Sequence, residues 1–458
     1  MKIDSVAVLL KYYNGELNPF DQSALECALC TGLKVSVLAM APISVKPQLE
    51  SITRLGADAI LVSDNLYAGS DTLATSFVLS KALQKLKPDV IFCGRQSVDG
   101  DTAQVPPMLA KRLGYGIVPK IIEFDGLSYK IRNGKVGYIE KNCIYTFERI
   151  KALRFPSIFS KTKEVKVISN KELTLNSDEV GVKGSPTQVV KTYQSQVGRR
   201  FCKFIDVKDL GKIISESLNR KVEHFDKGKE NSELLDEVFY FGDVKDKAES
   251  IVKKAVKLVY KNKTADIIVR ELKELDAKTV LFSDDEKLKL LASELAVLTN
   301  SGLTADCTSL SVQDQKLIMT RPARGGDITA DIICKSDMTL ATLRTTNKKG
   351  ADVIFSIGKG AIPYANKIKS WAKKYDAEVC ASRSVVDSGT MPYQSQVGLT
   401  GKSVAPKVYV AFGISGAVQH TCAISNAGTV IAVNVDKNAG IFDYSDYGVK
   451  GDLQDVEL

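Results

Sequence analysis

The sequence is poor in histidine and tryptophan and has no long apolar run, and each shortage excludes a class of function. Two histidines and one tryptophan occur in 458 residues, so general acid/base chemistry that relies on several imidazoles is excluded. No apolar run approaches the length of about 20 residues that spans a bilayer. The N-terminal segment has no small-residue cleavage site and does not resemble a signal peptide. We therefore expect a cytoplasmic protein without stable membrane insertion.

Charge and cysteine content exclude two further classes. The formal net charge is +9, and the lysines are scattered among acidic residues, which argues against nucleic-acid binding. The nine cysteines are widely spread, and an odd count is typical of reduced thiols. Cys27 and Cys30 are the one pair with metal-ligand spacing. We interpret them as two small buried residues on one helical face and not as metal ligands. We expect no bound metal.

The hydrophobic pattern indicates parallel sheets. Short apolar runs such as "SVAVLL", "KVSVLAM" and "DVIFCG" are separated by amphipathic stretches, which predicts strands covered by helices on both faces. In "SYKIRNGKVGY" the residues alternate around an Asn-Gly pair, which predicts a hairpin. Residues 176–235 lack periodicity and contain the best linker candidate, and a second α/β run follows.

Glycine-rich turns follow three apolar strands in the last third of the chain. "VIFSIGKG" ends at residues 358–360, "VYVAFGISGAVQH" continues through residues 413–420, and "VIAVNVD" ends near Asn434. In open parallel sheets such turns offer backbone N–H groups to phosphate. Together with "GLTGK" at 398–402, they favour a dinucleotide site and place His420 beside it.

These residues also resemble a known family. "ASRSVVDSGTMPYQSQVGLTGKSVAPKVYVAFGISGAVQH" and "AVNVDKNAGIFDYSDYGVKGDL" resemble the FAD-binding domain of the electron transfer flavoprotein α subunit. "NPFDQSALE", "DTLATSFVLSKAL", "CGRQSVDGDTAQVPPMLA" and "GVKGSPTQV" resemble the β subunit. "TNSGLTADC" and "TRPARGGD" are similar to the end of the α subunit's N-terminal domain, which is shortened here. The chain thus resembles a fusion with the β-like half first, closest to the anaerobic bacterial branch, some of whose members bifurcate electrons.

The resemblance implies an α/β fold of parallel sheets flanked by helices, with two nucleotide-binding-like domains and a C-terminal flavodoxin-like FAD domain. We expect a β-like domain at 1–205, a linker at 206–235, a shortened α-type N-terminal domain at 236–345 and the FAD domain at 346–458. Lys359 stands where the family has arginine, which keeps the charge but loses the forked grip on pyrophosphate. Leu399 stands where the family has glutamine.

The resemblance also implies roles for individual residues. Arg383 would lie over the flavin ring, Thr400 near flavin N5, and His420 at the pyrimidine end, where it would stabilise negative charge on the reduced flavin. A histidine satisfied within the core is the alternative for His420. The other residues expected to hold FAD are Lys359, Ser382, Val397, Gly398, Leu399, Ser415, Gly416, Ala417, Val418, Gln419, Asn434, Asp452 and Leu453.

A second nucleotide site is implied in the β-like half, holding either AMP or a second FAD. A loop after "DVIFCG" offers N–H groups, and Thr102 and Gln104 add polar contacts suited to phosphate. The alternative is a solvated acidic loop. We prefer a second FAD, because Gly100 leaves room where AMP-binding members carry aspartate. The expected residues are Asn18, Thr75, Gly94, Gln96, Asp99, Gly100, Asp101, Thr102, Ala103 and Gln104.

Residues 153–167 resemble the family's partner-recognition loop, with Ile158 where the family has a leucine anchor. Ile158 could instead belong to an inward-facing strand. The resemblance implies electron transfer with an acyl-CoA dehydrogenase-type flavoenzyme, and with NADH and ferredoxin if the protein bifurcates electrons. The alternative function is a colourless, non-redox adenine-nucleotide-binding protein of the universal stress protein type.

Overall fold

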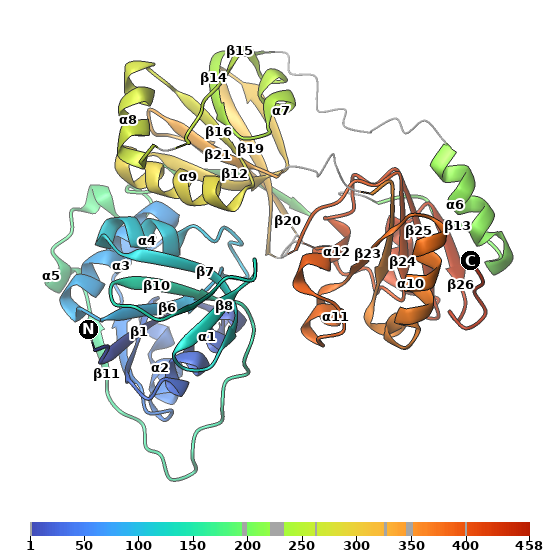
Figure 1. Cartoon of the computed structure of the whole chain (residues 1–458). Helices are drawn as coiled ribbons and strands as arrows, with labels where there is room; N and C mark the ends of the chain where they lie inside the picture. Colours follow the sequence, from blue (N-terminus) through green and yellow to red (C-terminus); the bar gives the residue numbers. More distant parts are fainter. Residues whose placement is uncertain are drawn as a thin grey trace. The chain divides into compact units, whose positions relative to one another are not determined.

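The computed structural model describes residues 2–194, 199–219, 233–261, 263–324, 328–344, 351–398 and 401–458. They form two compact units, and Figure 1 labels many of their elements. The first unit comprises residues 1–191, 231–324 and 330–343, and the second comprises 192–230, 325–329 and 344–458. No helix in the described ranges is long and apolar enough to cross a bilayer.

A nine-stranded sheet forms the larger part of the first unit. Its first seven strands are parallel, and the last two form antiparallel hairpins. In spatial order the strands are β11 (Val165–Ile168), β5 (Asp58–Val62), β4 (Lys34–Met40), β1 (Ser5–Leu10), β6 (Val90–Gly94), β10 (Cys143–Phe147), β7 (Gly116–Phe124), β8 (Ser128–Ile131) and β9 (Val136–Tyr138). The predicted parallel sheet and the hairpin at Asn-Gly are both confirmed. A separate small hairpin joins β2 (Tyr12–Tyr13) and β3 (Glu16–Leu17).

Each face of this sheet is covered by helices, because its strands carry apolar residues at successive positions. Val6 and Val8 of β1 belong to one core cluster, and Ala7 and Leu9 belong to another on the opposite face. The first face packs against α1 (Pro19–Cys30) and α2 (Lys46–Thr53), and the second against α3 (Thr72–Leu86) and α4 (Val105–Leu113). A short α5 (Asn170–Leu173) follows β11.

A smaller parallel sheet completes the first unit. It has the order β15 (Val252–Lys257), β14 (Leu235–Phe241), β16 (Thr279–Ser283), β21 (Thr339–Leu343) and β17 (Gly302–Cys307). Its helices are α7 (Lys245–Glu249), α8 (Ala265–Glu274) and α9 (Glu286–Thr299). Met108 of α4 packs into the same core cluster as Leu291 of α9. A separate four-stranded sheet has the order β12 (Thr187–Gln194), β20 (Ile328–Cys334), β19 (Lys316–Ala323) and β18 (Ser309–Gln313).

The second unit contains one six-stranded parallel sheet. Its order is β13 (Lys203–Phe204), β26 (Tyr447–Lys450), β25 (Thr429–Asn434), β24 (Val408–Phe412), β22 (Val353–Ile357) and β23 (Glu378–Ala381). Three helices come from the same stretch of sequence, namely α10 (Ala365–Lys374), α11 (Arg383–Asp387) and α12 (Val418–Thr421). The sheet thus belongs to the doubly wound α/β class predicted from the sequence.

One helix of the second unit lies where the sequence predicts a linker. Within residues 206–235, α6 (Leu210–Asn219) forms and buries Leu210 and Ile214 against the core that contains Phe355 and Phe412. Figure 1 shows α6 beside the strands of this unit. The apolar face of α6 is short, and the sheet that it covers comes much later in the sequence. Local periodicity therefore did not reveal this helix.

Candidate functional site

The strands of the second unit end at one edge, and the chain reverses between β22 and β24. It leaves β22 for β23 on one side and then returns to the other side of β22 for β24, β25 and β26. Open parallel sheets bind ligands beyond the carboxyl ends of the strands at such a reversal. Residues 358–360 follow β22 and residues 413–416 follow β24, so the two predicted glycine turns meet at the reversal point.

Backbone contacts hold these two turns together. The Gly358 N–H donates to Phe412 O at 2.8 Å, and the Gly360 N–H donates to Gly413 O at 3.3 Å. Asn434, the last residue of β25, donates through Nδ2 to Ile414 O at 2.8 Å. Asn434 therefore positions the second turn, whichever ligand the turn binds.

The parallel strands bring most predicted FAD-site residues to this edge. Lys359 is exposed after β22, and Ser415 and Gln419 are exposed after β24. Ser382 occupies the N-cap position of α11 after β23, and Arg383 is the first residue of that helix. The side chain of Arg383 is 31% exposed and its Nε lies 3.4 Å from Asp387 Oδ2. The arrangement gathers two cations, hydroxyl groups and turn N–H groups on one edge.

Two predicted residues, Asp452 and Leu453, have contacts within the chain itself. Asp452 accepts hydrogen bonds from the Gln454 N–H at 2.9 Å and the Tyr364 hydroxyl at 2.8 Å, and these bonds lower the pKa of its carboxyl. The side chain of Leu453 is buried in the core. Leu399 and Thr400 lie outside the described residues. Their predicted roles stay predictions.

His420 is buried with one ring nitrogen bonded and the other without a partner. Its Nε2 lies 2.8 Å from the Tyr409 hydroxyl, while Nδ1 makes no hydrogen bond with the described part of the chain. Burial lowers the pKa of His420 to about 4, and a polar interaction of the ring with the Val397 backbone acts in the opposite direction. At neutral pH the ring is therefore an uncharged group with an unused polar atom, which fits a polar ligand at this edge.

In the first unit, Asp21 connects two strand ends at the predicted second nucleotide site. Its carboxylate accepts two backbone hydrogen bonds. One comes from the N–H of Lys11, just after β1, at 2.8 Å, and the other from the N–H of Gly94, at the end of β6, at 2.9 Å. Burial raises the pKa of Asp21 to about 7, and these N–H bonds oppose the rise. Asn18 donates through Nδ2 to Gln96 O at 2.9 Å. Its Oδ1 is buried without a partner among the described residues, which leaves an acceptor for a ligand N–H or O–H.

The loop at residues 95–104 is held by the second half of the first unit. Gln104 accepts from the Thr72 hydroxyl at 3.0 Å and donates to Leu303 O at 3.2 Å. Arg321 donates to Gly100 O at 2.8 Å. Gln104 therefore has a structural role that sequence reasoning did not predict. A β-carbon on Gly100 would meet only Ser97 Oγ, at 3.4 Å, so packing within the chain does not require this glycine.

A cavity of about 80 Å³ adjoins this loop and is rich in basic side chains. Arg95 is almost fully buried, and its Nε lies 3.2 Å from Glu148 Oε1. Burial lowers the pKa of Lys120, whose Nζ lies 3.5 Å from Glu286. Lys289 pairs with Asp306 at 2.7 Å. Sequence analysis missed these cations because each comes from a different segment, although Arg95 directly follows a predicted strand.

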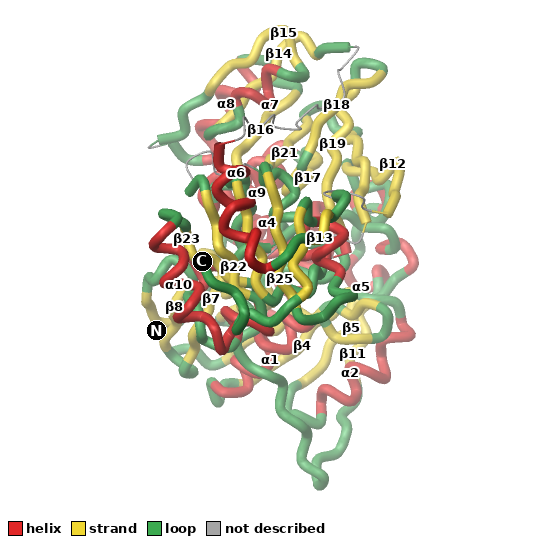
Figure 2. Tube along the Cα trace, turned by 90° about the vertical axis from the view of Figure 1, so that its right-hand side faces the viewer, coloured by secondary structure: helices red, strands yellow, loops and turns green. Residues whose placement is uncertain are grey.

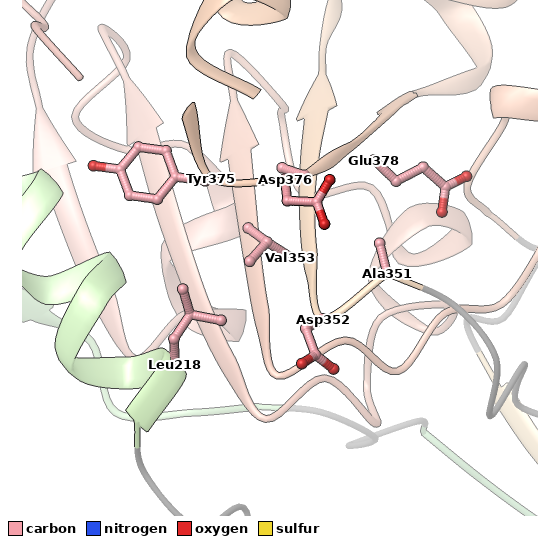
Figure 3. Close-up of a pocket in the computed structure, with 8 residues that line it drawn as sticks. Leu218, Ala351, Asp352, Val353, Tyr375, Asp376 and Glu378 are labelled. Carbon is pink, nitrogen blue, oxygen red and sulfur yellow. The ribbon is translucent and has the colours of Figure 1, made fainter. Parts of the chain in front are cut away.

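A larger cavity, about 540 Å³, lies elsewhere in the second unit (Figure 3). It is lined by Val353 and Glu378, the first residues of β22 and β23. Figure 3 shows Leu218 on one side of it and the carboxyl groups of Asp352 and Asp376 on the other. It therefore lies at the amino ends of the strands, opposite the edge that carries the glycine turns, and it is not the predicted FAD site.

The predicted recognition loop projects from the first unit between β10 and β11, without helix or strand (Figures 1 and 2). Ile158 is 84% exposed, so it does not belong to an inward-facing strand. Phe155 and Phe159 are exposed to a similar degree, and sequence analysis did not single them out. Arg154 pairs with Glu26 at 2.7 Å and Lys163 with Asp58 at 2.9 Å, so both ends of the loop are anchored.

Comparison with known proteins agrees with this geometry. Residues 6–132 and 248–380 match the family model described as the electron transfer flavoprotein domain. Residues 348–425 match the electron transfer flavoprotein FAD-binding domain. The chain belongs to the electron transfer flavoprotein family.

Relatives of both subunits match this electron transfer flavoprotein. The β subunit of Thermoanaerobacterium thermosaccharolyticum is 40% identical over 38% of this chain and 75% of its own length. The α subunit of the same organism is 34% identical over 40% of this chain and 69% of its own length. A third relative, the acryloyl-CoA reductase electron transfer subunit β of Anaerotignum propionicum, is 32% identical over 42% of this chain and 72% of its own length. The chain is a fusion of β-type and α-type sequences, and the family match favours the redox function over the non-redox alternative.

Proposed function

We propose that this chain is a single-polypeptide electron carrier that holds FAD at the strand ends of its second unit. The observation that carries the proposal is the meeting of residues 358–360 and 413–416 at the sheet reversal, followed directly by α12, in which buried His420 has an unpartnered Nδ1 among the described residues. FAD, when bound, supplies the electron-accepting ring. The residues of the chain supply its binding, orientation and electrostatic environment.

Each residue type at this edge suits a different part of FAD. Backbone N–H groups of the two turns and the hydroxyl of Ser415 suit phosphate and ribityl oxygens. Lys359 adds a positive charge to the pyrophosphate as a single point donor. Arg383 favours negative charge on the reduced ring, and His420 donates a hydrogen bond to the pyrimidine end. Thr400 is proposed near N5, and Gly398 and Val397 would approach through their backbone.

We also propose a second nucleotide in the first unit, either FAD or AMP. The unpartnered Oδ1 of Asn18 and the three cations that line the nearby cavity, each paired with a carboxylate, support a nucleotide with phosphate groups. A cavity of about 80 Å³ is smaller than the roughly 300–1,000 Å³ typical of small-molecule pockets. An isoalloxazine ring would therefore need this cavity to widen, whereas AMP would need the loop alone. A second FAD would provide a starting point for bifurcation with NADH and ferredoxin, and AMP would make the protein a simple carrier.

The proposed partner is an acyl-CoA dehydrogenase-type flavoenzyme. The relative from Anaerotignum propionicum is named as an electron transfer subunit of acryloyl-CoA reductase, and the exposed loop with Ile158 gives this chain an apolar surface for docking. Electron exchange would then occur within a transient complex.

Nucleotide analysis tests the proposal directly. The purified full chain, incubated with excess FAD and AMP and then desalted, is expected to be yellow and to release at least one FAD per chain on heating. Two FAD per chain would support the second-flavin form, and one FAD with one AMP would support the simple carrier. A colourless protein that releases no FAD would overturn the proposal.

A further inference from the structure

We propose that Tyr409 is a positioning residue that fixes the neutral ring of His420 with its proton on Nδ1, facing the FAD site. The inference rests on the proposed function, and it deepens it by assigning the electronic form in which His420 meets the flavin. Tyr409 lies within β24, which leads directly into the turn at residues 413–416. It therefore acts from inside the sheet and not from the ligand-binding edge.

The contact between the two side chains is short and shielded from water. The Tyr409 hydroxyl lies 2.8 Å from His420 Nε2. Tyr409 is fully buried and His420 is 6% exposed. A neutral imidazole has one nitrogen that donates and one that accepts. The position of the proton in this contact therefore determines whether the other nitrogen, Nδ1, donates or accepts a hydrogen bond.

Two arrangements of that proton are possible, and they give opposite properties to Nδ1. If the Tyr409 hydroxyl donates to Nε2, Nδ1 carries a proton and acts as a donor. If Nε2–H donates to the hydroxyl, Nδ1 is an acceptor, which would repel the oxygen and nitrogen lone pairs of the flavin pyrimidine edge. Burial raises the pKa of Tyr409 well above its ordinary value, with the Ser356 hydroxyl acting in the opposite direction. The hydroxyl therefore keeps its proton and can donate it.

The surroundings of the ring support the first arrangement. The Val397 backbone raises the pKa of His420, as a carbonyl oxygen does when it faces a ring N–H and not a ring acceptor. Nδ1 still makes no hydrogen bond of good geometry with the described residues, and a buried donor without a partner is costly. A flavin oxygen or ring nitrogen at this edge would satisfy it. Because the ring is neutral, the hydrogen bond strengthens as the flavin is reduced, without adding a full positive charge beside that of Arg383. Tyr409 thus keeps His420 a neutral hydrogen-bond donor, while Arg383 supplies the positive charge.

Nuclear magnetic resonance of ¹⁵N-histidine-labelled full chain tests the tautomer without any cofactor. The chain has two histidines, so His224→Gln assigns both signals. We expect the wild-type His420 signal to show the Nδ1–H form, and Tyr409→Phe to lose it. After loading with FAD, the equilibrium ratio of reduced to oxidised flavin at a given potential should be about tenfold lower in Tyr409→Phe than in wild type. For a two-electron couple that corresponds to a potential lower by about 30 mV.

Tyr145→Phe is the matched control, since the Tyr145 hydroxyl is also buried and accepts the Glu140 N–H at 2.6 Å in the first unit. It should change neither the His420 signal nor the potential. A wild-type His420 in the Nε2–H form would overturn the inference, and so would an unchanged potential in FAD-loaded Tyr409→Phe. If the variant does not fold, the wild-type spectrum alone decides. If the chain binds no FAD, the proposed function fails, and the spectrum of the FAD-free protein still decides between the two tautomers.

Discussion

A β-carbon on Gly358 would lie 2.1 Å from the carbonyl oxygen of Gly413. The two turns at the sheet reversal therefore pack backbone against backbone, and any side chain at Gly358 must push them apart. Overpacking of this kind costs about 1–3 kcal/mol. We expect Gly358→Ala to destabilise the second unit by that amount and to lower its FAD content.

The single tryptophan makes this measurement specific. Trp371 is buried in the core of the second unit, so denaturant unfolding followed by its fluorescence reports on that unit. Gly360→Ala is the matched control, because a β-carbon there would be 3.5 Å from its nearest neighbour. Equal stability of the two variants would contradict the close approach of the turns.

Arg383→Ala should lower the potential at which the bound FAD takes up its first electron. A guanidinium about 4 Å from the ring would favour the anionic flavin by roughly 4 kcal/mol at an effective dielectric constant near 20, which corresponds to about 170 mV for one electron. The side chain is 31% exposed and close to Asp387, so the measured shift should be well below this ceiling. Asp387→Asn should shift the potential in the opposite direction. Spectroelectrochemical titration measures both, and an unchanged potential in Arg383→Ala would remove its proposed role.

The stability of the second unit should fall as the pH decreases from about 6.5 to about 4. The pKa of His420 is about 4 in the folded chain and 6.5 ordinarily, so the unfolded chain binds the proton more tightly. Stability is therefore fully present above pH 6.5 and is lost toward pH 4, by at most about 3 kcal/mol. Trp371 fluorescence in the FAD-free chain measures the slope. In His420→Gln this contribution should disappear, and the same slope in both proteins would show that other groups cause it.

Ile158→Ala should weaken electron transfer to the partner and leave folding unchanged. The side chain is 84% exposed, and truncation of an exposed residue usually changes stability by less than about 0.5 kcal/mol. Loss of an interface anchor typically weakens the free energy of binding by more than about 1 kcal/mol. We therefore expect the KM for the flavoenzyme to rise at least several-fold. Ile43→Ala is the control, because Ile43 is another exposed isoleucine of the first unit. Equal kinetics in both variants would argue against the anchor.

The sheets and the strand-end residues could be predicted from the sequence because their signals are local. Each strand is a short apolar run, and each glycine turn directly follows one. Parallel strands then bring Lys359, Ser415 and Asn434 to one edge without further information. The resemblance supplied what the pattern could not, namely the flavin and the role of His420.

Long-range contacts could not be predicted in this way. Arg95, Lys120 and Lys289 come together only because three separate segments fold around one cavity. Tyr409 looks like any other buried strand residue, since nothing near it in the sequence reveals its contact with His420. The sequence alone predicts a linker at α6, because the core partners of this helix come from strands far later in the chain.

The insertion of α6 and β13 into the second unit also determines when that unit can fold during synthesis. Lys203 and Phe204 of β13 pair with Tyr447 and Gly448 of β26, and Leu210 of α6 packs in the same core as Val449. Residues 231–324 and 330–343 of the first unit leave the ribosome between these partners. An apolar helix face and an edge strand must therefore wait, uncovered, until the last strand emerges. The nascent chain carries its greatest aggregation hazard in that interval, and the emergence of β26 ends it.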